Sequence, residues 1–175
     1  QTCALPISKE KPGQLIYAST GVGSNAHFGT ELFKHMTGTN MLHVPYKGGG
    51  PALIDTVSGQ VHMMIVPVVS AIGHIKSNRL RALAVSGARR TPMLPEVSTI
   101  ADTGVPGYEY ITWYGLLAPA ATPVVLIAKL NQSVARALAA PDLRERFAQQ
   151  GVEVEASTPE RFAALLQQEL PRWAQ

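Results

Sequence analysis

The stretch LIYASTGVGSN, residues 15–25, joins a short apolar run of strand-forming residues to a tight glycine turn. Beyond the turn, apolar side chains recur every four residues, as they do on one face of an α-helix. Ser24 is a good N-cap for that helix, and Gly38 is a typical residue just past a helix end. The stretch therefore predicts a strand, a glycine turn and a helix, in that order.

The same order of elements is predicted twice more along the chain. Residues 41–46 form the second predicted strand, and the turn KGGG at residues 47–50 follows it. The next helix opens at Pro51 and stops before Gly59, which is the usual punctuation of a helix. Residues 62–67 then predict a third strand, which leads into a short apolar helix. Three such units in succession indicate a layered fold.

Alternation of strands and helices with short glycine-rich links predicts an α/β fold with a mainly parallel sheet. A fourth strand is predicted over residues 81–86, and its nearly continuous apolar character indicates a strand that is covered on both faces. In such sheets, ligands bind beyond the carboxyl ends of the strands. The links between each strand and the following helix are therefore the first places to look for a site.

The pattern changes in the second half of the chain. Residues 91–107 are rich in proline and glycine, so they indicate a crossover or hinge, with one short helix near residues 100–103. A further strand is predicted over residues 112–118. Amphipathic helices follow, and Pro171 should kink or end the last of them. Successive amphipathic helices indicate a layer different from the preceding α/β part.

Composition excludes several classes of protein. With 46% hydrophobic and 15% charged residues, this chain of 175 residues has enough apolar side chains to bury a core. The fifteen Lys and Arg residues are scattered and the formal net charge is only +3, which does not resemble a nucleic-acid binder. The one cysteine, Cys3, lies in residues 1–7, which look like a translated sequencing adapter and are excluded from the fold. Disulfides and thiol catalysis are therefore not expected.

The turn at residues 21–26 could bind an anion, because free backbone N–H groups and a helix N-terminus both present partial positive charge. Its G-x-G-x-x-A pattern also fits the loose dinucleotide fingerprint, which requires an acidic residue about 20 positions later. The second strand ends instead at Tyr46 and Lys47. Lys47 could meet a 2′-phosphate, so an NADP-dependent oxidoreductase that uses the Gly21–Gly23 loop remains an alternative. A second alternative is that the turn has no ligand and merely connects the strand to the helix.

Support for catalysis is weak in this sequence. Ser24 and His27 share one face of the predicted helix, but no G-x-S-x-G elbow occurs and no carboxylate is placed to orient the imidazole. The five histidines do not show the spacing of metal ligands, and no two carboxylates converge by spacing. We therefore expect a binding protein without a catalytic residue, a metal ion or a cofactor.

Four blocks of sequence together resemble one known family. They are YASTGVGSNAH at residues 17–27, HVPYKG at residues 43–48, LRALAV at residues 80–85 and GLLAPA at residues 115–120. Their order and spacing are similar to those of the substrate-binding receptors of tripartite tricarboxylate transporters, the Bug family of periplasmic solute receptors. The likeness extends from Lys11 to Trp173 and is more specific than any single motif.

This resemblance implies a two-lobed periplasmic-binding-protein fold of type II, the Venus flytrap. Residues 8–111 would form the second lobe, and residues 112–175 would supply the crossover and the C-terminal part of the first lobe. Such a receptor is a monomer and not an enzyme. It captures a small carboxylated solute in the periplasm by lobe closure and delivers it to membrane permease subunits, and its signal peptide would lie upstream of this sequence. A carboxylate sensor for a signalling partner is a further alternative.

The resemblance also implies which residues bind the solute. The matching positions are Ser19, Gly21, Gly23, Ser24, Asn25 and His27 in the first loop, Tyr46, Lys47 and Gly48 in the second, and Val66 and Pro67 after the third strand. Amides and hydroxyls of the first loop would hold a ligand carboxylate, in part through ordered water. Tyr46 would shape the cleft, in preference to a charge contact by Lys47. Many members carry an acid or amide where this chain has Val66 and Pro67, so a tricarboxylate, dicarboxylate or aromatic acid is favoured over an amino acid.

Overall fold

A computed structural model describes the backbone of residues 12–173 and the side chains of residues 12–171. These residues form two compact units, of which the first extends to Thr112 and the second begins at Trp113. The adapter-like residues 1–7 lie outside the described part of the chain. No helix among the described residues is both long enough and apolar enough to span a membrane.

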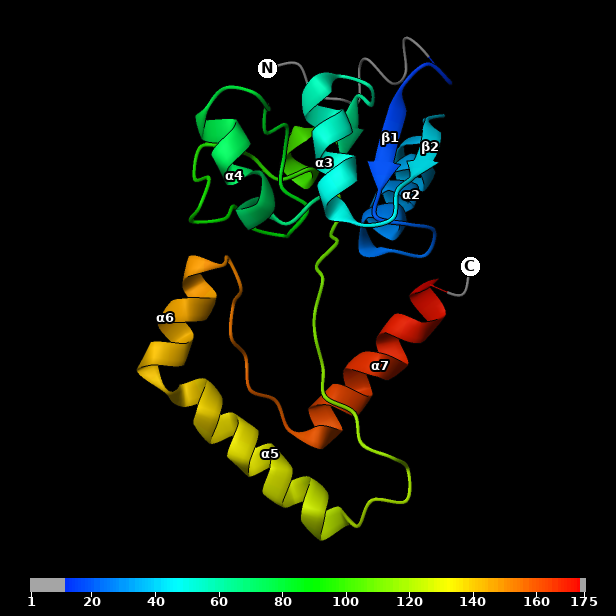
Figure 1. Ribbon diagram of the computed structural model, residues 1–175. Helices are drawn as coiled ribbons and strands as arrows, with labels where there is room; N and C mark the ends of the chain where they lie inside the picture. The colour runs from blue at the N-terminus through cyan, green and yellow to red at the C-terminus, as the bar shows by residue number, and fades with distance from the viewer. Residues whose placement is uncertain (1–11, 174–175) are drawn as a thin grey trace. The chain divides into compact units, whose positions relative to one another are not determined.

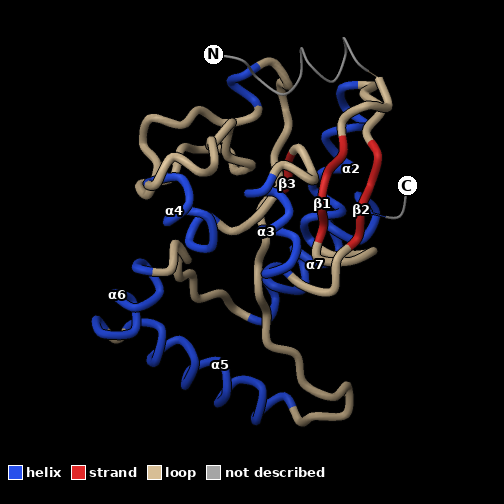
Figure 2. Tube along the Cα trace, turned by 45° about the horizontal axis from the view of Figure 1, so that its top comes forward, coloured by secondary structure: helices blue, strands red, loops and turns tan. Residues whose placement is uncertain are grey.

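The first unit is built on a three-stranded sheet with the order β2-β1-β3. Its strands are β1 (Ile16–Ser19), β2 (Leu42–Pro45) and β3 (Met63–Met64), and β1 is parallel to both neighbours. Figure 1 labels β1 and β2, and Figure 2 labels all three strands. Tyr17 is in register with His43 of β2 and with Met63 of β3. Figure 2 shows β1 and β2 running side by side. Because all strands run in one direction, their carboxyl ends meet at the same edge, as the sequence predicts for a parallel α/β sheet.

Each strand is followed by a helix, as expected. The helices are α2 (Asn25–Thr37), α3 (Gly49–Ser58) and α4 (Val68–Lys76), and η1 (Ala101–Thr103) is the short helix expected within the proline- and glycine-rich segment. Ser24 caps α2 and Gly38 ends it, which confirms both predicted caps. α3 begins two residues before the predicted start at Pro51, because a proline is tolerated anywhere in the first turn, where N–H groups have no helical partner.

The core of the first unit lies on both faces of β1. On one face, Ala18 packs in a buried cluster with Ala52 of α3 and with Val61. On the other face, Tyr17 is fully buried and its hydroxyl group reaches Glu31 of α2. Alternate residues of a strand point to opposite faces, so α3 and α2 cover opposite sides of β1. This burial on both sides accounts for the apolar run that the sequence shows here.

Two strands of the first unit differ from the prediction. β3 spans only two residues instead of the whole of residues 62–67. Residues 81–86 do not form the predicted fourth strand, because only Val85 makes a bridge. The backbone of Val85 bonds to residues 98–100 and not to β3. Leu83 is exposed, so the segment is not covered on both faces either. Its apolar composition indicated burial that its neighbours do not provide.

The second unit contains the three amphipathic helices that the sequence predicts. They are α5 (Val124–Ala139), α6 (Pro141–Gln149) and α7 (Pro159–Trp173). The ring of Trp113 meets the ring of Phe162 edge to face, with 5.6 Å between centroids. Asn131 Nδ2 of α5 donates a hydrogen bond to Ser157 O at 2.8 Å. These contacts attach the start of α7 to Trp113, and they attach the residues just before α7 to α5.

The second unit departs from the prediction at two places. Residues 112–118 form no strand, and their side chains are exposed. A strand needs backbone hydrogen bonds from a neighbouring strand, so aromatic residues alone do not produce one. Pro171 does not end α7, which continues to Trp173, so of the two predicted effects the end is ruled out and the kink stays a prediction. A proline removes one N–H donor, but its φ angle remains compatible with a helix.

Candidate functional site

Three links follow β1, β2 and β3 at the carboxyl edge of the sheet, where a ligand site is expected. The first two links are in contact: the Tyr46 N–H donates to Ser19 O at 3.0 Å, and a Cβ on Gly21 would lie 3.6 Å from Tyr46 O. Val66 and Pro67 follow β3, which pairs with the other side of β1. The structure therefore brings all three predicted links to one edge of the first unit.

The first link, here called the glycine loop, comprises residues 20–24. Gly21 and Gly23 have φ values of 133° and 77°, a range that disfavours residues with a side chain. The Gly21 amide donates to Ser19 Oγ at 3.2 Å, and the Gly23 amide donates to Nδ1 of His27 at 3.3 Å. The two glycines thus allow the sharp passage from β1 into α2, and both of their amides are already bonded.

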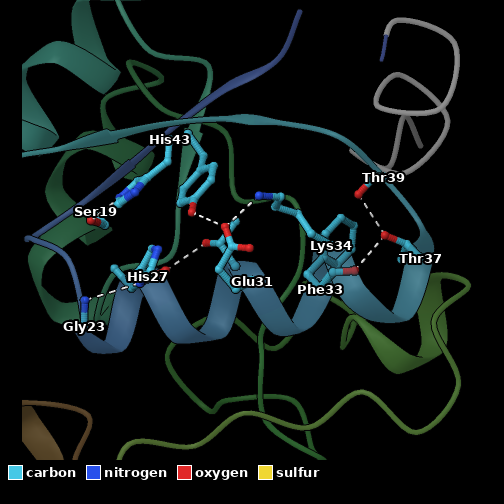
Figure 3. Close-up of polar contacts among 12 residues, drawn as sticks. Ser19, Gly23, His27, Glu31, Phe33, Lys34, Thr37, Thr39 and His43 are labelled. Atoms are coloured by element: carbon cyan, nitrogen blue, oxygen red, sulfur yellow. Dashed lines mark hydrogen bonds and ion pairs between the residues drawn. The ribbon is translucent and has the colours of Figure 1, made fainter. Parts of the chain in front are cut away.

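Ser19 is fully buried, and a network at the N-terminal end of α2 surrounds its hydroxyl group (Figure 3). Its Oγ lies 2.6 Å from Nε2 of His43. The His43 ring stacks on the ring of Tyr17 at 4.7 Å and on the ring of His27 at 4.4 Å between centroids. These three rings, here called the ring stack, therefore lie beside the glycine loop and support the side chains that bond to it.

A carboxylate lies next to the ring stack. Glu31 Oε1 accepts hydrogen bonds from the Tyr17 hydroxyl at 2.5 Å and from Lys34 Nζ at 2.7 Å. Burial acts to raise the pKa of Glu31, but the bonds from Lys34 and Tyr17 outweigh it and hold that pKa below its ordinary value. Burial and the bond to Glu31 raise the pKa of Tyr17. Burial, and then the positive charge of His27, lower the pKa of His43, which favours its neutral form.

The second link carries Tyr46, Lys47 and Gly48. The Tyr46 hydroxyl donates to Asp55 Oδ2 of α3 at 2.7 Å, and this bond raises the pKa of Tyr46. Its ring packs against the buried cluster around Ala18. Lys47 is exposed, and Gly48 immediately precedes α3. Tyr46 is therefore fixed in position by two elements, as a residue that shapes one wall of a cleft would need to be.

The third link offers no charged group to a ligand. Val66 is half-buried, and Pro67 is exposed at the start of α4. Neither side chain could accept a hydrogen bond from an ammonium group. Throughout the described residues, no group of three or more His, Cys, Asp or Glu side chains could hold a metal ion.

The amides at the start of α2 divide into bonded and open groups. Ser24 Oγ accepts the His27 amide at 3.3 Å, and the two glycine amides are bonded as described above. The first N–H groups of an α-helix have no partner within the helix. The N–H groups of Asn25 and Ala26 therefore have no partner within the helix; Asn25 is exposed, and Ala26 is buried. Together with the helix dipole, they can bind one carboxylate or phosphate group.

Sequence reasoning missed two residues of this network. It does not single out His43 or Glu31 as residues of the site. A signal exists for His43, because it and Tyr17 each lie two residues before the end of their strands; that the two are in register is shown by the structure alone. A weaker signal exists for Glu31, which lies one helical turn after His27 and so shares its face of α2.

Comparison with known proteins identifies relatives of the chain. The family model described as tripartite tricarboxylate transporter family receptor matches residues 4–175. One relative is the UPF0065 protein in the tcbD-tcbE intergenic region of Pseudomonas sp. (strain P51). It is 42% identical over 173 residues, which are 98% of this chain and 52% of that protein. The chain thus spans about half the length of this curated relative.

Solved structures with similar folds include two that hold organic acids. R. palustris Rpa4515 with adipate has a TM-score of 0.86 and 34% identity, over 98% of this chain and 57% of that one. MatC (Rpa3494) from Rhodopseudomonas palustris with bound malate has a TM-score of 0.80 and 32% identity, over 97% of this chain and 59% of that one. The periplasmic binding protein BugD has a TM-score of 0.83 and 33% identity, over 98% of this chain and 58% of that one. These matches confirm the predicted α/β periplasmic-binding-protein fold, while the assignment of residues 8–111 and 112–175 to particular lobes stays a prediction.

Proposed function

Because the chain belongs to the tripartite tricarboxylate transporter family of receptors, we propose that it forms part of a solute receptor and binds one carboxylate of a small organic acid at the start of α2. The observation that carries this proposal is the pair of open amides on Asn25 and Ala26, which lie beside the glycine loop at the edge where three links meet. The acid would accept hydrogen bonds from these two amides.

The other residues of the site would act through the shape of the loop. Ser19 is buried, so its hydroxyl group would hold Gly21 and not contact the acid. The bonded amide of Gly23 would likewise fix the turn. Tyr46 would form a wall of the cleft, with Gly48 at its rim. Lys47, which is exposed, would add only a screened attraction for an anion.

The solute would be a plain or aromatic acid and not an amino acid. Adipate and malate, held by two solved structures similar to this chain, are both dicarboxylates, which supports this class. Val66 and Pro67 supply no anionic partner for an α-amino group. A tricarboxylate, a dicarboxylate and an aromatic acid would each place one carboxylate at this anion-binding edge.

In this proposal the receptor binds its solute without chemical change. It closes around the solute in the periplasm and passes it to the membrane permease subunits of a tripartite tricarboxylate transporter. The family to which the chain belongs supports this role, as does its likeness to the periplasmic binding protein BugD. Contacts from both sides of a cleft would favour the closed state, because a ligand shifts a conformational equilibrium by its differential affinity for the two states.

The alternative of an NADP-dependent oxidoreductase has less support. A dinucleotide fingerprint needs the glycine loop to approach a pyrophosphate through its backbone. Here the amides of both glycines already donate to protein side chains. A phosphate could still occupy the N-terminus of α2, so the experiment below includes nicotinamide dinucleotides as one arm.

A thermal-shift screen of the full-length gene product tests the proposal. It covers mono-, di- and tricarboxylates, aromatic acids, amino acids and nicotinamide dinucleotides. We expect a saturable rise in Tm for one class of carboxylate, because a ligand that binds the folded state stabilises it by mass action. No rise with any carboxylate would contradict the proposal, and a rise with a dinucleotide alone would favour the alternative.

A matched pair of variants locates the site. Asn25→Asp keeps the size of the side chain and suits a helix N-terminus, but it adds a negative charge beside the open amides. We expect it to weaken carboxylate binding at least about tenfold by repulsion between like charges. Asn40→Asp adds the same charge at an exposed residue before β2, at the opposite edge of the sheet, and should bind like the wild type. Equal affinities in both variants would exclude α2 as the site.

A further inference from the structure

The side chains of Ser19 and His27 hold the glycine loop, and the ring of His43 contacts both of them (Figure 3). Ser19 Oγ accepts from the N–H of Gly21 at 3.2 Å and donates to its C=O at 3.0 Å. His27 Nδ1 accepts the amide of Gly23 at 3.3 Å. The ring of His43 contacts Ser19 through Nε2 and stacks on His27. The shape of the loop therefore depends on two imidazoles.

We propose that His27 is a positioning residue that keeps the glycine loop in its anion-binding shape only while its imidazole is uncharged. The effect on carboxylate affinity rests on the function proposed above, but the conformation of the loop can be observed without any ligand. The inference follows from the direction of the hydrogen bond between Gly23 and His27. A backbone N–H group can only donate, so Nδ1 of His27 must present a lone pair to Gly23. Neutral His27 then holds its proton on Nε2.

Protonation of His27 at Nδ1 replaces this acceptor by a second donor that faces the Gly23 amide. The hydrogen bond is lost, and the new positive charge lies at the N-terminus of α2, where the helix dipole disfavours it. The imidazolium therefore turns away from the loop. Gly23, which has a φ of 77° and the wide conformational freedom of glycine, is then released.

The charged and titratable groups around the His27 ring come from three elements. His43 of β2 stacks on it, and Tyr17 of β1 stacks on the far side of His43. Glu31 and Lys34 follow on α2 and pair with each other at 2.7 Å. Glu31 also accepts from Tyr17, so its charge is largely compensated by two donors. Burial, and then the positive charge of His27, lower the pKa of His43, which favours the neutral form of the ring that stacks on His27.

The geometry predicts a pH dependence opposite to the usual one. An imidazolium beside an anion site ordinarily attracts the anion, so affinity rises as the pH falls. Here a charge on His27 removes the preorganised shape of the loop, so affinity for a carboxylate falls as the pH is lowered through the range in which histidine titrates. The loss of one hydrogen bond should make binding about three- to tenfold weaker when His27 is charged, and measurements at about pH 6 and about pH 8 compare the two conditions.

Adipate titrations of the full-length gene product at these two pH values test the inference. His27→Asn is the conservative variant, because Asn Oδ1 and His Nδ1 are both bonded to Cγ and Asn does not titrate. It should bind adipate within about threefold of the wild type at pH 8 and show no pH dependence. His27→Leu has no acceptor and should bind weakly at both pH values. His35→Asn changes an exposed histidine later on α2 and should keep the wild-type profile.

Amide NMR spectra of the ligand-free receptor give a second readout. In the wild type, the Gly23 amide should shift with the same midpoint as the His27 ring, and in His27→Asn it should not shift. A Gly23 amide that ignores the titration of His27, or an adipate affinity that rises as the pH falls, would overturn the inference. If no carboxylate binds at any pH while the Gly23 amide still follows His27, the proposed function fails but the control of the loop by His27 stands.

Discussion

The two units of this chain bury their side chains to very different degrees. In the first unit, Tyr17, Ala18 and Ser19 of β1 are fully buried, because the sheet is covered on both faces. In the second unit, no side chain from residue 113 to residue 171 is buried. Both units nevertheless have helices where the periodicity predicts them. Helix formation is therefore a local property of this sequence, whereas a buried core needs partners from distant parts of the chain.

This difference also bears on where a precise site can be built. The glycine loop leaves directly from the buried end of β1, so fixed groups surround it and hold its amides. The irregular residues 113–123 of the second unit are almost entirely exposed. Preorganised binding groups need a rigid support, and the first unit supplies one next to the candidate site.

The largest contrast should come from the same substitution in each unit. Tyr108 is 1% exposed and donates to Gly29 O at 2.9 Å, so Tyr108→Ala should lower the free energy of unfolding of the first unit by about 3–5 kcal/mol. Tyr114 is 85% exposed, so Tyr114→Ala should change the free energy of unfolding of the second unit by less than about 0.5 kcal/mol. Denaturation of the 175-residue chain measures both. Similar losses for the two variants would contradict the contrast.

A second test compares two glycines within the first unit. A Cβ on Gly29 would lie 2.8 Å from Cδ1 of Tyr110, which is buried, so Gly29→Ala should destabilise the unit by about 1–3 kcal/mol. Gly73 lies in α4 with nothing within 4 Å of such a Cβ, so Gly73→Ala should stabilise by about 0.4–1 kcal/mol. Urea unfolding of both variants measures the sign of the change in the free energy of unfolding for each. A stabilising Gly29→Ala would show that the packing around Tyr110 is loose.

The smallest effect should appear in the dependence of stability on acid. The pKa of Glu31 is lowered in the folded state, so its contribution is present above its ordinary, unfolded pKa and is lost as the pH falls through the folded pKa. The wild type should therefore lose more stability between about pH 5 and pH 3 than Glu31→Gln does. Thermal melts across this range measure the difference.

A carboxylate of the second unit is the control for that experiment. Glu155 forms an exposed ion pair with Arg161 at 2.5 Å, and exposed pairs contribute little to stability. Glu155→Gln should therefore follow the acid profile of the wild type. If Glu155→Gln changes the profile as much as Glu31→Gln, the pairing of Glu31 with Tyr17 and Lys34 is not what sets the acid dependence.

Much of the fold could be predicted from the sequence, because its signals are local. The caps Ser24 and Gly38, and the helices of both units, follow from residue type and spacing within one or two turns. Residues 81–86 and 112–118 do not form the predicted strands within this chain, which spans about half the length of the curated relative described above, because a strand needs a neighbouring strand as its partner. Composition indicates that a segment is suited to a strand, but it does not supply the partner.

The candidate site was predictable only in part, for the same reason. The glycine loop and its position at the edge of a parallel sheet follow from the order of elements. The occupation of the amides of Gly21 and Gly23 by Ser19 and His27 does not, because it depends on side-chain direction. The contact of His43 with Ser19 depends on the register of β1 against β2, which the sequence leaves open.

The measurement that tests the central claim most directly is a titration of the ¹⁵N-labelled full-length gene product with adipate, followed by amide NMR. We predict saturable shifts that are largest at the amides of Asn25 and Ala26, with smaller shifts through the glycine loop and at Gly48. Saturable binding that leaves the amides of Asn25 and Ala26 unshifted would contradict the assignment of the carboxylate to the start of α2. The same contradiction would follow if no dicarboxylate bound at all.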